Sequence, residues 1–333
     1  MTYRLRFTGL VVACLGGLAL SNGAAEKEID PDSFGGPTEL QDTFLPAQVR
    51  YQSYSESGRV LAKGKWRVTL EEDWTAHLAK TDTYLFDGES VTSTVKIRHS
   101  PFEYWEFGVD LPYTFRFDGE ADEFIEFVET TLNAPVPARY ELPREVYQAT
   151  LATPGGNLMT LLEEDGFSDI TLRAKRSLLR YETSGVDLAA VATLALPTGE
   201  HTFGGNGFSP GLGLHLQKPV FTWLNLYTGV SGVYYSDHNE QGLELHDLRG
   251  MVYGGAAWKP FNWGELLFFY QVYSPLARSN DPLDEPAHYY SVTGRLFLGQ
   301  HVTFEAGVVE NVGLIENRNS SDATFKFALA GHF

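Results

Sequence analysis

The sequence predicts an all-β fold, a transmembrane antiparallel up-and-down β-barrel of about 12 strands. Two patterns indicate this fold. Apolar and polar residues alternate along segments that repeat from residue 64 to the C-terminus, and the connections between these segments are mostly short and long in turn. Barrels of the bacterial outer membrane show both patterns, because short turns join their strands on the periplasmic side and longer loops join them outside.

The alternation is clearest in residues 104–117, which read YWEFGVDLPYTFRF. The apolar positions are Trp105, Phe107, Val109, Leu111, Tyr113, Phe115 and Phe117. Strands of soluble proteins usually have about five or six residues, so a segment of this length favours a membrane-spanning strand.

We count about twelve such segments. They are residues 64–79, 89–99, 104–117, 167–181, 186–197, 207–217, 222–236, 247–258, 265–274, 288–298, 301–310 and 322–333. In lipid every backbone group must be paired, so the sheet must close into a barrel. An even number of strands places both termini of the barrel on the periplasmic side, and ten or fourteen strands would do the same.

The longest connection, residues 118–166, is predicted to be an extracellular loop. Apolar residues recur at helical spacing from Phe124 to Leu132, and Pro135 follows, which predicts a short amphipathic helix. This helix would be either a lid over the lumen or an element that packs across the barrel mouth.

The N-terminus, residues 1–25, has the properties of a secretory signal peptide. Arg4 and Arg6 precede an apolar run that ends at Leu20, and small residues end at Ala25. Lipidation of Cys14, the one cysteine, is the less favoured alternative. The barrel is predicted over residues 59–333. The polar residues 26–58 precede it and would either form a periplasmic tether or fold into the lumen.

The composition excludes some classes of partner. The formal net charge is -18, from 25 basic and 43 acidic residues, which argues against nucleic-acid binding. A mean hydropathy of -0.19 excludes a helical membrane protein. The 33 glycines and the 14% aromatic residues suit an all-β protein.

The alternation also predicts which side chains face the lumen. A charged side chain facing lipid costs about 2–4 kcal/mol at the bilayer midplane, so the charged set should face inward. The predicted lumen residues, which would line a possible solute path, are Arg67, Glu71, Asp73, Arg98, Glu106, Asp110, Arg116, Asp169, Arg173, Arg249, Arg295 and Glu305. Lys65, Lys96, Lys175 and Lys326 belong to the same set. The outer face carries aromatic residues suited to membrane interfaces, namely Trp66, Trp105, Tyr113, Tyr234, Trp258 and Tyr290.

The ordered pieces FGGP, GKWRVTLEEDW, EFGVDLPY, FIEFVETTLNAP, GFSDITLRAK, LALPTG, VVEN and DATFKFALAGHF resemble a bacterial outer-membrane barrel family catalogued as domain-of-unknown-function family 3187. The resemblance implies an outer-membrane location and assigns no substrate or catalytic residue.

The C-terminal strand resembles the signal that the barrel assembly machinery reads. Phe325, Phe327, Leu329 and Phe333 match its alternating apolar residues and terminal aromatic, whereas Gly331 departs from it. The expected partners are therefore this machinery, periplasmic chaperones, and the lipid and lipopolysaccharide of the outer membrane. The oligomeric state stays open.

Motifs for an enzyme are scarce. The sequence contains no zinc motif, P-loop or nucleophile elbow, so we expect no cofactor, no metal and no catalysis. One hydrolase hypothesis survives, in which a serine and a histidine such as Ser93 and His99 would act on the lipid-facing wall.

Two functions stay open at this point. In the first, the six lumen arginines oppose the acidic residues and line a channel for small solutes. In the second, these charges pair and fill a non-conducting barrel whose acidic loops bind partners or bridge lipopolysaccharide through divalent cations. Asp281, Asp284 and Glu285 are the loop carboxylates of that reading.

Overall fold

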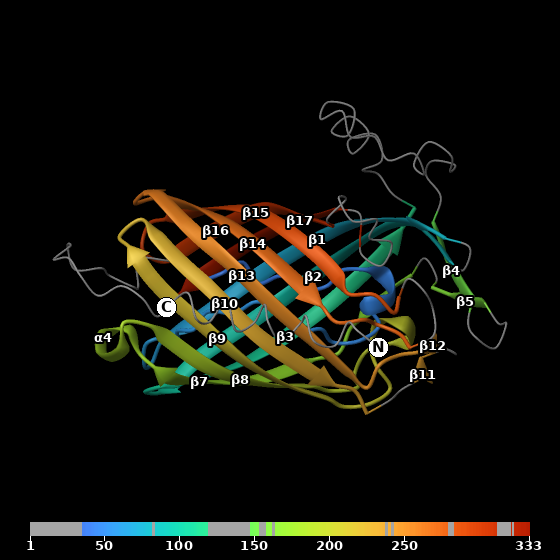
Figure 1. Ribbon diagram of the computed structural model, residues 1–333, viewed down its shortest axis with the longest axis horizontal. Coiled ribbons are helices and arrows are strands. Elements are labelled where there is room, and N and C mark those ends of the chain that lie inside the picture. Colours follow the sequence, from blue (N-terminus) through green and yellow to red (C-terminus); the bar gives the residue numbers. More distant parts are fainter. Residues whose placement is uncertain are drawn as a thin grey trace, which may run out of the picture.

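Long antiparallel strands make up most of this computed structural model, which describes residues 35–81, 84–118, 147–152, 158–161, 164–236, 239–240, 243–278, 283–311, 321 and 323–333 (Figure 1). The barrel strands are β1 (Trp66–Lys80), β2 (Tyr84–Phe102), β3 (Trp105–Phe117), β7 (Thr171–Leu179), β8 (Asp187–Ala195), β9 (Ser209–Phe221), β10 (Leu224–Tyr234), β13 (Leu248–Phe261), β14 (Gly264–Tyr273), β15 (Ala287–Leu298), β16 (Val302–Asn311) and β17 (Ala323–His332). The predicted fold and strand count are confirmed.

The barrel closes between its first and last strands. β1 pairs with β17 from Arg67 opposite His332 to Ala76 opposite Ala323, and β1 also pairs with β2. Two 3.0 Å hydrogen bonds join the backbones of Trp66 and Phe333 at the end of this seam. Neighbouring strands pair all around the barrel, which satisfies the backbone groups as lipid requires.

The two ends of the barrel differ. At the turn end, where the C-terminus lies, strands are joined by short connections such as the one containing α4 (Tyr181–Ser184) (Figure 1). At the loop end lie the short elements η3 (Leu45–Ala47), β4 (Gln148–Ala152), β5 (Leu158–Thr160), β6 (Asp165–Phe167), η4 (His201–Phe203), β11 (Asn239–Glu240) and β12 (Leu243–Glu244). The helix predicted between Phe124 and Leu132 lies outside the described residues, as does the predicted signal peptide.

The strands present opposite faces to the lumen and to the outside. On β1, Leu70 is 47% exposed, whereas its neighbour Glu71 is 5% exposed. All six aromatic residues predicted at membrane interfaces are exposed or half-buried on the outer face. One predicted facing is wrong, because Lys65 precedes β1 and is exposed. Ala76 faces outward but is buried there, because it packs against Trp74 and Phe325.

Residues 35–58, which we call the plug segment, lie inside the barrel. The segment begins near the turn end, where Arg295 donates a 2.7 Å hydrogen bond to the carbonyl of Gly36. It turns at η3 near the loop end and returns to the turn end, where Gly58 lies against the backbone of Asp187. Since the chain crosses the lumen twice, it fills space that would otherwise connect the two ends (Figure 1).

Candidate functional site: the lumen

A dense set of charges lines one side of the lumen, on β1, β2, β3, β7 and β17. We call it the charged wall, and its members are Arg67, Glu71, Asp73, Lys96, Arg98, Glu106, Asp110, Arg173, Lys175 and Lys326. Most of these side chains are buried, and they pair with one another across neighbouring strands. Lys326 lies 2.9 Å from Glu71 and 3.0 Å from Asp73, while Arg98 forms an ion pair with Asp110.

A second cluster of charges lies on β14, β15 and β16. Arg295 is directly opposite Glu265 on one neighbouring strand and Glu305 on the other. Its guanidinium group pairs with both carboxylates, at 2.5 Å from Glu305. Arg295 and Glu305 were predicted from the sequence, whereas Glu265 was not. Glu265 is separated by an even number of positions from the inward residues of β14, so the alternation alone could have predicted that it faces the lumen.

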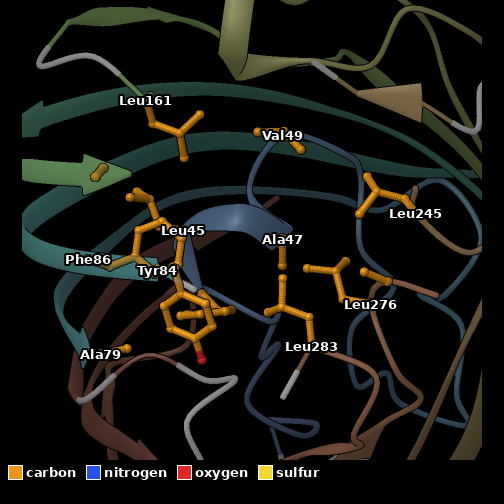
Figure 2. Close-up of a cluster of buried hydrophobic side chains, with 13 residues drawn as sticks. Leu45, Ala47, Val49, Ala79, Tyr84, Phe86, Leu161, Leu245, Leu276 and Leu283 are labelled. Carbon is orange, nitrogen blue, oxygen red and sulfur yellow. The ribbon is translucent and has the colours of Figure 1, made fainter. Parts of the chain in front are cut away.

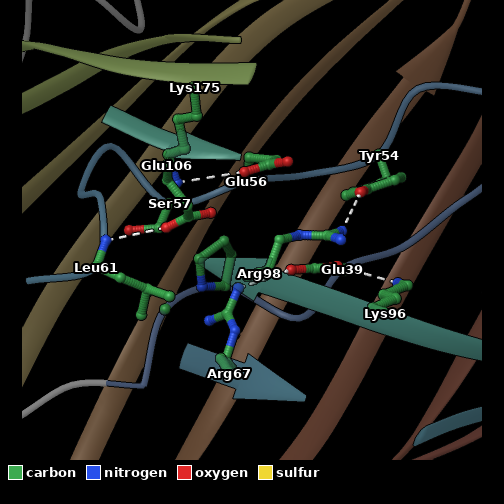
Figure 3. A network of polar contacts seen from close by, with 12 residues as sticks. Glu39, Tyr54, Glu56, Ser57, Leu61, Arg67, Lys96, Arg98, Glu106 and Lys175 are labelled. Carbon is green, nitrogen blue, oxygen red and sulfur yellow. Dashed lines mark hydrogen bonds and ion pairs between the residues drawn. The ribbon is translucent and has the colours of Figure 1, made fainter. Parts of the chain in front are cut away.

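The plug segment supplies carboxylates to the basic residues of the wall (Figure 3). Glu39 accepts a 3.0 Å hydrogen bond from Lys96 and lies 3.4 Å from Arg67. Glu56 pairs with Arg173 and lies 3.3 Å from Lys175. A buried ion pair repays its desolvation only with good geometry and further hydrogen bonds, so these contacts require a precise position of the plug.

The plug also contacts the ion pair of Arg98 and Asp110 through a tyrosine. The hydroxyl of Tyr54 donates a 2.8 Å hydrogen bond to Asp110 and accepts one of 2.8 Å from Arg98. Asp42 forms an ion pair with Arg249 of β13. The plug is therefore bound to charged groups on several sides of the barrel.

Tyrosines line the inward face of β10, β13, β14 and β15. We call this the tyrosine wall, and its members are Tyr227, Tyr253, Tyr273 and Tyr289, all 2% exposed or less. Three of them bind the plug. Tyr253 donates to the carbonyl of Glu56, Tyr273 donates to the carbonyl of Ser53 at 3.0 Å, and Tyr289 donates to the carboxylate of Asp42 at 2.5 Å.

At the loop end the plug is held by apolar contacts (Figure 2). The turn around η3 inserts its apolar residues among side chains of the barrel rim and the loops. The buried members of this cluster are Phe44, Leu45, Ala47, Val49, Ala79, Tyr84, Phe86, Ala149, Leu161, Leu245, Leu276, Ala277 and Leu283. The plug thus has an apolar tip and two polar arms.

The plug leaves separate cavities in the described lumen. One of about 310 Å³ lies at the turn end and is lined by Glu39, Glu56, Arg67 and Lys175 among others. A cavity of about 70 Å³ nearer the loop end is lined by Lys96 among others. Since Glu39 lines the first and Lys96 lines the second, their ion pair stands between the two cavities.

The sequence matches a family described as proteins of unknown function, DUF3187, over residues 32–333. The chain belongs to the DUF3187 family. Its structure is similar to that of an outer membrane channel from Pseudomonas putida F1, with a TM-score of 0.55 and 12% identity over 82% of this chain and 96% of that chain. The NanC porin aligns with a TM-score of 0.47 and 7% identity, over 80% of this chain and 98% of that chain. No curated protein sequence matches this chain. The DUF3187 protein therefore has the fold of an outer-membrane channel.

Two predicted lumen residues hold a loop of the DUF3187 barrel and take no part in the charged wall. Arg116 donates a 2.6 Å hydrogen bond to the hydroxyl of Thr202 and lies over the ring of Phe203. Asp169 accepts 2.9 Å hydrogen bonds from the backbone N–H groups of Gly199 and Gly205. Burial raises the pKa of Asp169, and these N–H groups oppose part of the rise because they favour the carboxylate.

A salt bridge holds the residue that follows the plug segment at the turn end. Arg59 lies 2.5 Å from Glu182 in α4, and Arg180 lies 3.3 Å from the same carboxyl group. Partial burial raises the pKa of Glu182, but its backbone N–H and the two guanidinium groups lower the pKa by more. The pKa therefore lies below the usual value.

The structure does not bring the hydrolase candidates together. Ser93 and His99 lie on the same strand, and Ser93 donates a 2.6 Å hydrogen bond to Glu72. The ring of His99 stacks on Trp66 with 3.9 Å between centroids. Glu72 and Trp66 lie at different positions along β1. Ser93 and His99 are therefore too far apart along β2 to form a catalytic pair.

Proposed function

We propose that this protein is an outer-membrane channel for small solutes and that the plug segment is its gate. The turn end would face the periplasm and the loop end would face the outside. In the structure described above, the plug separates the lumen cavities, so this arrangement corresponds to the closed state.

The observation that supports a movable plug is the polarity of both surfaces where the arms of the plug meet the barrel. Buried ion pairs such as Glu56 with Arg173 contribute little net stability compared with apolar packing of the same volume. A permanent filling would be more stable with an apolar interface. The facing surfaces of the plug and the barrel are both polar, so water can solvate them after they separate, as a gate requires.

The similarity to a protein described as an outer membrane channel supports the channel function at the level of the fold. The lumen charges of this chain would line the path after the plug moves.

The apolar tip favours the alternative, a non-conducting barrel that acts in structure or surface interaction. Leu45 and Ala47 are buried among loop residues, and burying a leucine side chain stabilises by about 1.5–3 kcal/mol. Such a cluster would hold the plug in place. The two functions predict opposite results when the plug is released.

A reversible cross-link tests the gate. Thr43 of the plug and Thr324 of β17 have hydroxyl oxygens 2.8 Å apart, so cysteines at these positions lie close enough for a disulfide. The double variant Thr43→Cys/Thr324→Cys would be recorded in planar bilayers with oxidant and then with reductant. Each single variant controls for effects of the substitutions themselves.

The expected result is that channel openings are absent under oxidant and appear after reduction, as in the unmodified protein. An absence of openings in both the unmodified and the reduced protein would support the non-conducting barrel. Equal conductance before and after reduction would show that the plug is no gate.

A further inference from the structure

The plug segment carries three acidic residues and one basic residue, and all three carboxylates bind cations of the barrel. Glu39 binds Lys96 and Arg67, Asp42 binds Arg249, and Glu56 binds Arg173 and Lys175. The plug is thus an acidic peptide bound in a site built for carboxylates.

The barrel cations differ in whether they would still have a carboxylate partner after the plug leaves. Lys326 and Arg295 each pair with carboxylates of the barrel itself. Within the described part of the chain, Arg67, Lys175 and Arg249 form ion pairs with the plug alone. Departure of the plug therefore removes the ion-pair partners of all three cations. Glu106, directly opposite Lys175 on β3, is the carboxylate that stays near one of them.

These three cations are distributed along the lumen. Arg67 and Lys175 both line the cavity of about 310 Å³ at the turn end. Arg249 lies near the loop end of β13, where β13 begins at Leu248. A poorly solvated cation without a partner is costly, so the open lumen favours the entry of anions.

The tyrosine wall adds donors to the same path. Tyr253 and Tyr273 donate to backbone carbonyls of the plug, and Tyr289 donates to the carboxylate of Asp42. With the plug displaced, these hydroxyl groups remain able to donate to the oxygen atoms of a solute.

We propose that the open lumen conducts small organic anions, whose carboxylate groups bind where the carboxylates of the plug bind in the closed state. This inference rests on the proposed channel function and names its class of substrate. The solute would contact Arg67, Lys175 and Arg249. In the closed state the plug occupies these cations and so competes with the solute for them.

Ion selectivity of the reduced Thr43→Cys/Thr324→Cys channel tests the inference. The reversal potential in a KCl gradient would be compared for this background, for added Lys175→Gln, and for added Arg176→Gln. Arg176 is the matched control, because it follows Lys175 on β7 but is exposed on the opposite face. Selectivity is measured in the open channel and is therefore independent of how often the gate opens.

The background is expected to prefer chloride, Lys175→Gln is expected to move the reversal potential toward zero, and Arg176→Gln is expected to leave it unchanged. Succinate added at the turn end should reduce the chloride current, and Lys175→Gln should weaken this block. An open channel that prefers potassium, or a succinate block that Lys175→Gln leaves intact, would overturn the inference alone. A reduced channel without any openings would instead overturn the proposed function together with this inference.

Discussion

Arg249 of β13 and Asp42 of the plug form an ion pair in which the side chains are 3% and 0% exposed. The same carboxylate accepts the hydroxyl of Tyr289, so one acidic side chain of the plug joins two strands of the barrel. The substitution Asp42→Asn keeps the shape of the side chain but leaves Arg249 buried without its charge partner.

Loss of one member of a buried pair costs about 3–5 kcal/mol. We therefore expect Asp42→Asn to increase the fraction of protein with a released plug by at least about 100-fold. Trypsin cleavage after Arg50, which is buried in the closed lumen, measures this fraction. Asp284→Asn, at an exposed carboxyl group of a loop, is the control and should leave the cleavage rate unchanged. Equal rates in both variants would contradict the prediction.

The hydroxyl of Tyr253 both donates to the carbonyl of Glu56 and accepts from its N–H group, so Tyr253→Phe removes two contacts of the plug. A buried group left without its partner costs about 1–3 kcal/mol. Hydrogen exchange at the amide of Glu56 should become faster. Tyr234→Phe, which is exposed on the outer face, should have no effect, and protection equal to the unmodified protein in both variants would refute the assignment.

Gly58 allows the plug to lie directly against β8. A Cβ atom at this position would meet the carbonyl oxygen of Asp187 at 2.4 Å and the backbone nitrogen of Gln217 at 2.8 Å. The backbone must therefore move away in Gly58→Ala, and we expect more frequent channel openings in bilayers. Gly254→Ala is a suitable control because nothing lies within 4 Å of its Cβ position. An opening frequency unchanged by Gly58→Ala would argue against a gate at this position.

The salt bridge between Arg59 and Glu182 should make the gate sensitive to acid. The pKa of Glu182 is lowered in the folded protein, so its contribution to stability is present above the unfolded pKa of about 4.3 and is lost as the pH falls through the folded value. Openings should become more frequent as the pH at the turn end falls below the unfolded pKa of this carboxyl group. Glu182→Gln should remove this part of the pH dependence. A pH profile identical in the variant would assign the effect to other groups.

Phe333 completes the barrel seam through its paired backbone hydrogen bonds with Trp66. Deletion of Phe333 removes these bonds and the proposed assembly signal, so we expect less folded barrel in outer-membrane fractions, measured by heat-dependent mobility in gels. Phe333→Tyr retains the terminal aromatic residue and should assemble normally. Normal assembly after the deletion would argue against the signal.

The facing of the strands could be predicted from the sequence because lipid enforces the alternation of side chains. Glu71 and Leu70 are adjacent and lie on opposite faces as predicted. Tyrosine is ambiguous by the same rule, since it suits both the membrane interface and a polar lumen. Tyr290 is 50% exposed as predicted, while Tyr289 beside it is fully buried and binds the plug. Alternation relative to Arg295 could have identified Tyr289 as an inward residue.

The path of the plug could not be predicted. Residues 35–58 show no period of two, so neither face nor direction follows from their pattern. The contacts that fix the segment join residues far apart in the sequence, such as Asp42 and Arg249, which are 207 positions apart. They exist only after the barrel has closed. Whether the predicted lumen residues form a solute path stays a prediction.

The plug is covalently attached to the barrel through the few residues between Gly58 and Trp66. A ligand on so short a tether acts at an effective concentration in the millimolar range, without any free peptide in solution. A solute that makes the same contacts would displace the plug only when its own concentration approaches that value. The length of this linker, and not the strength of any single contact, would then set the solute concentration at which the channel responds.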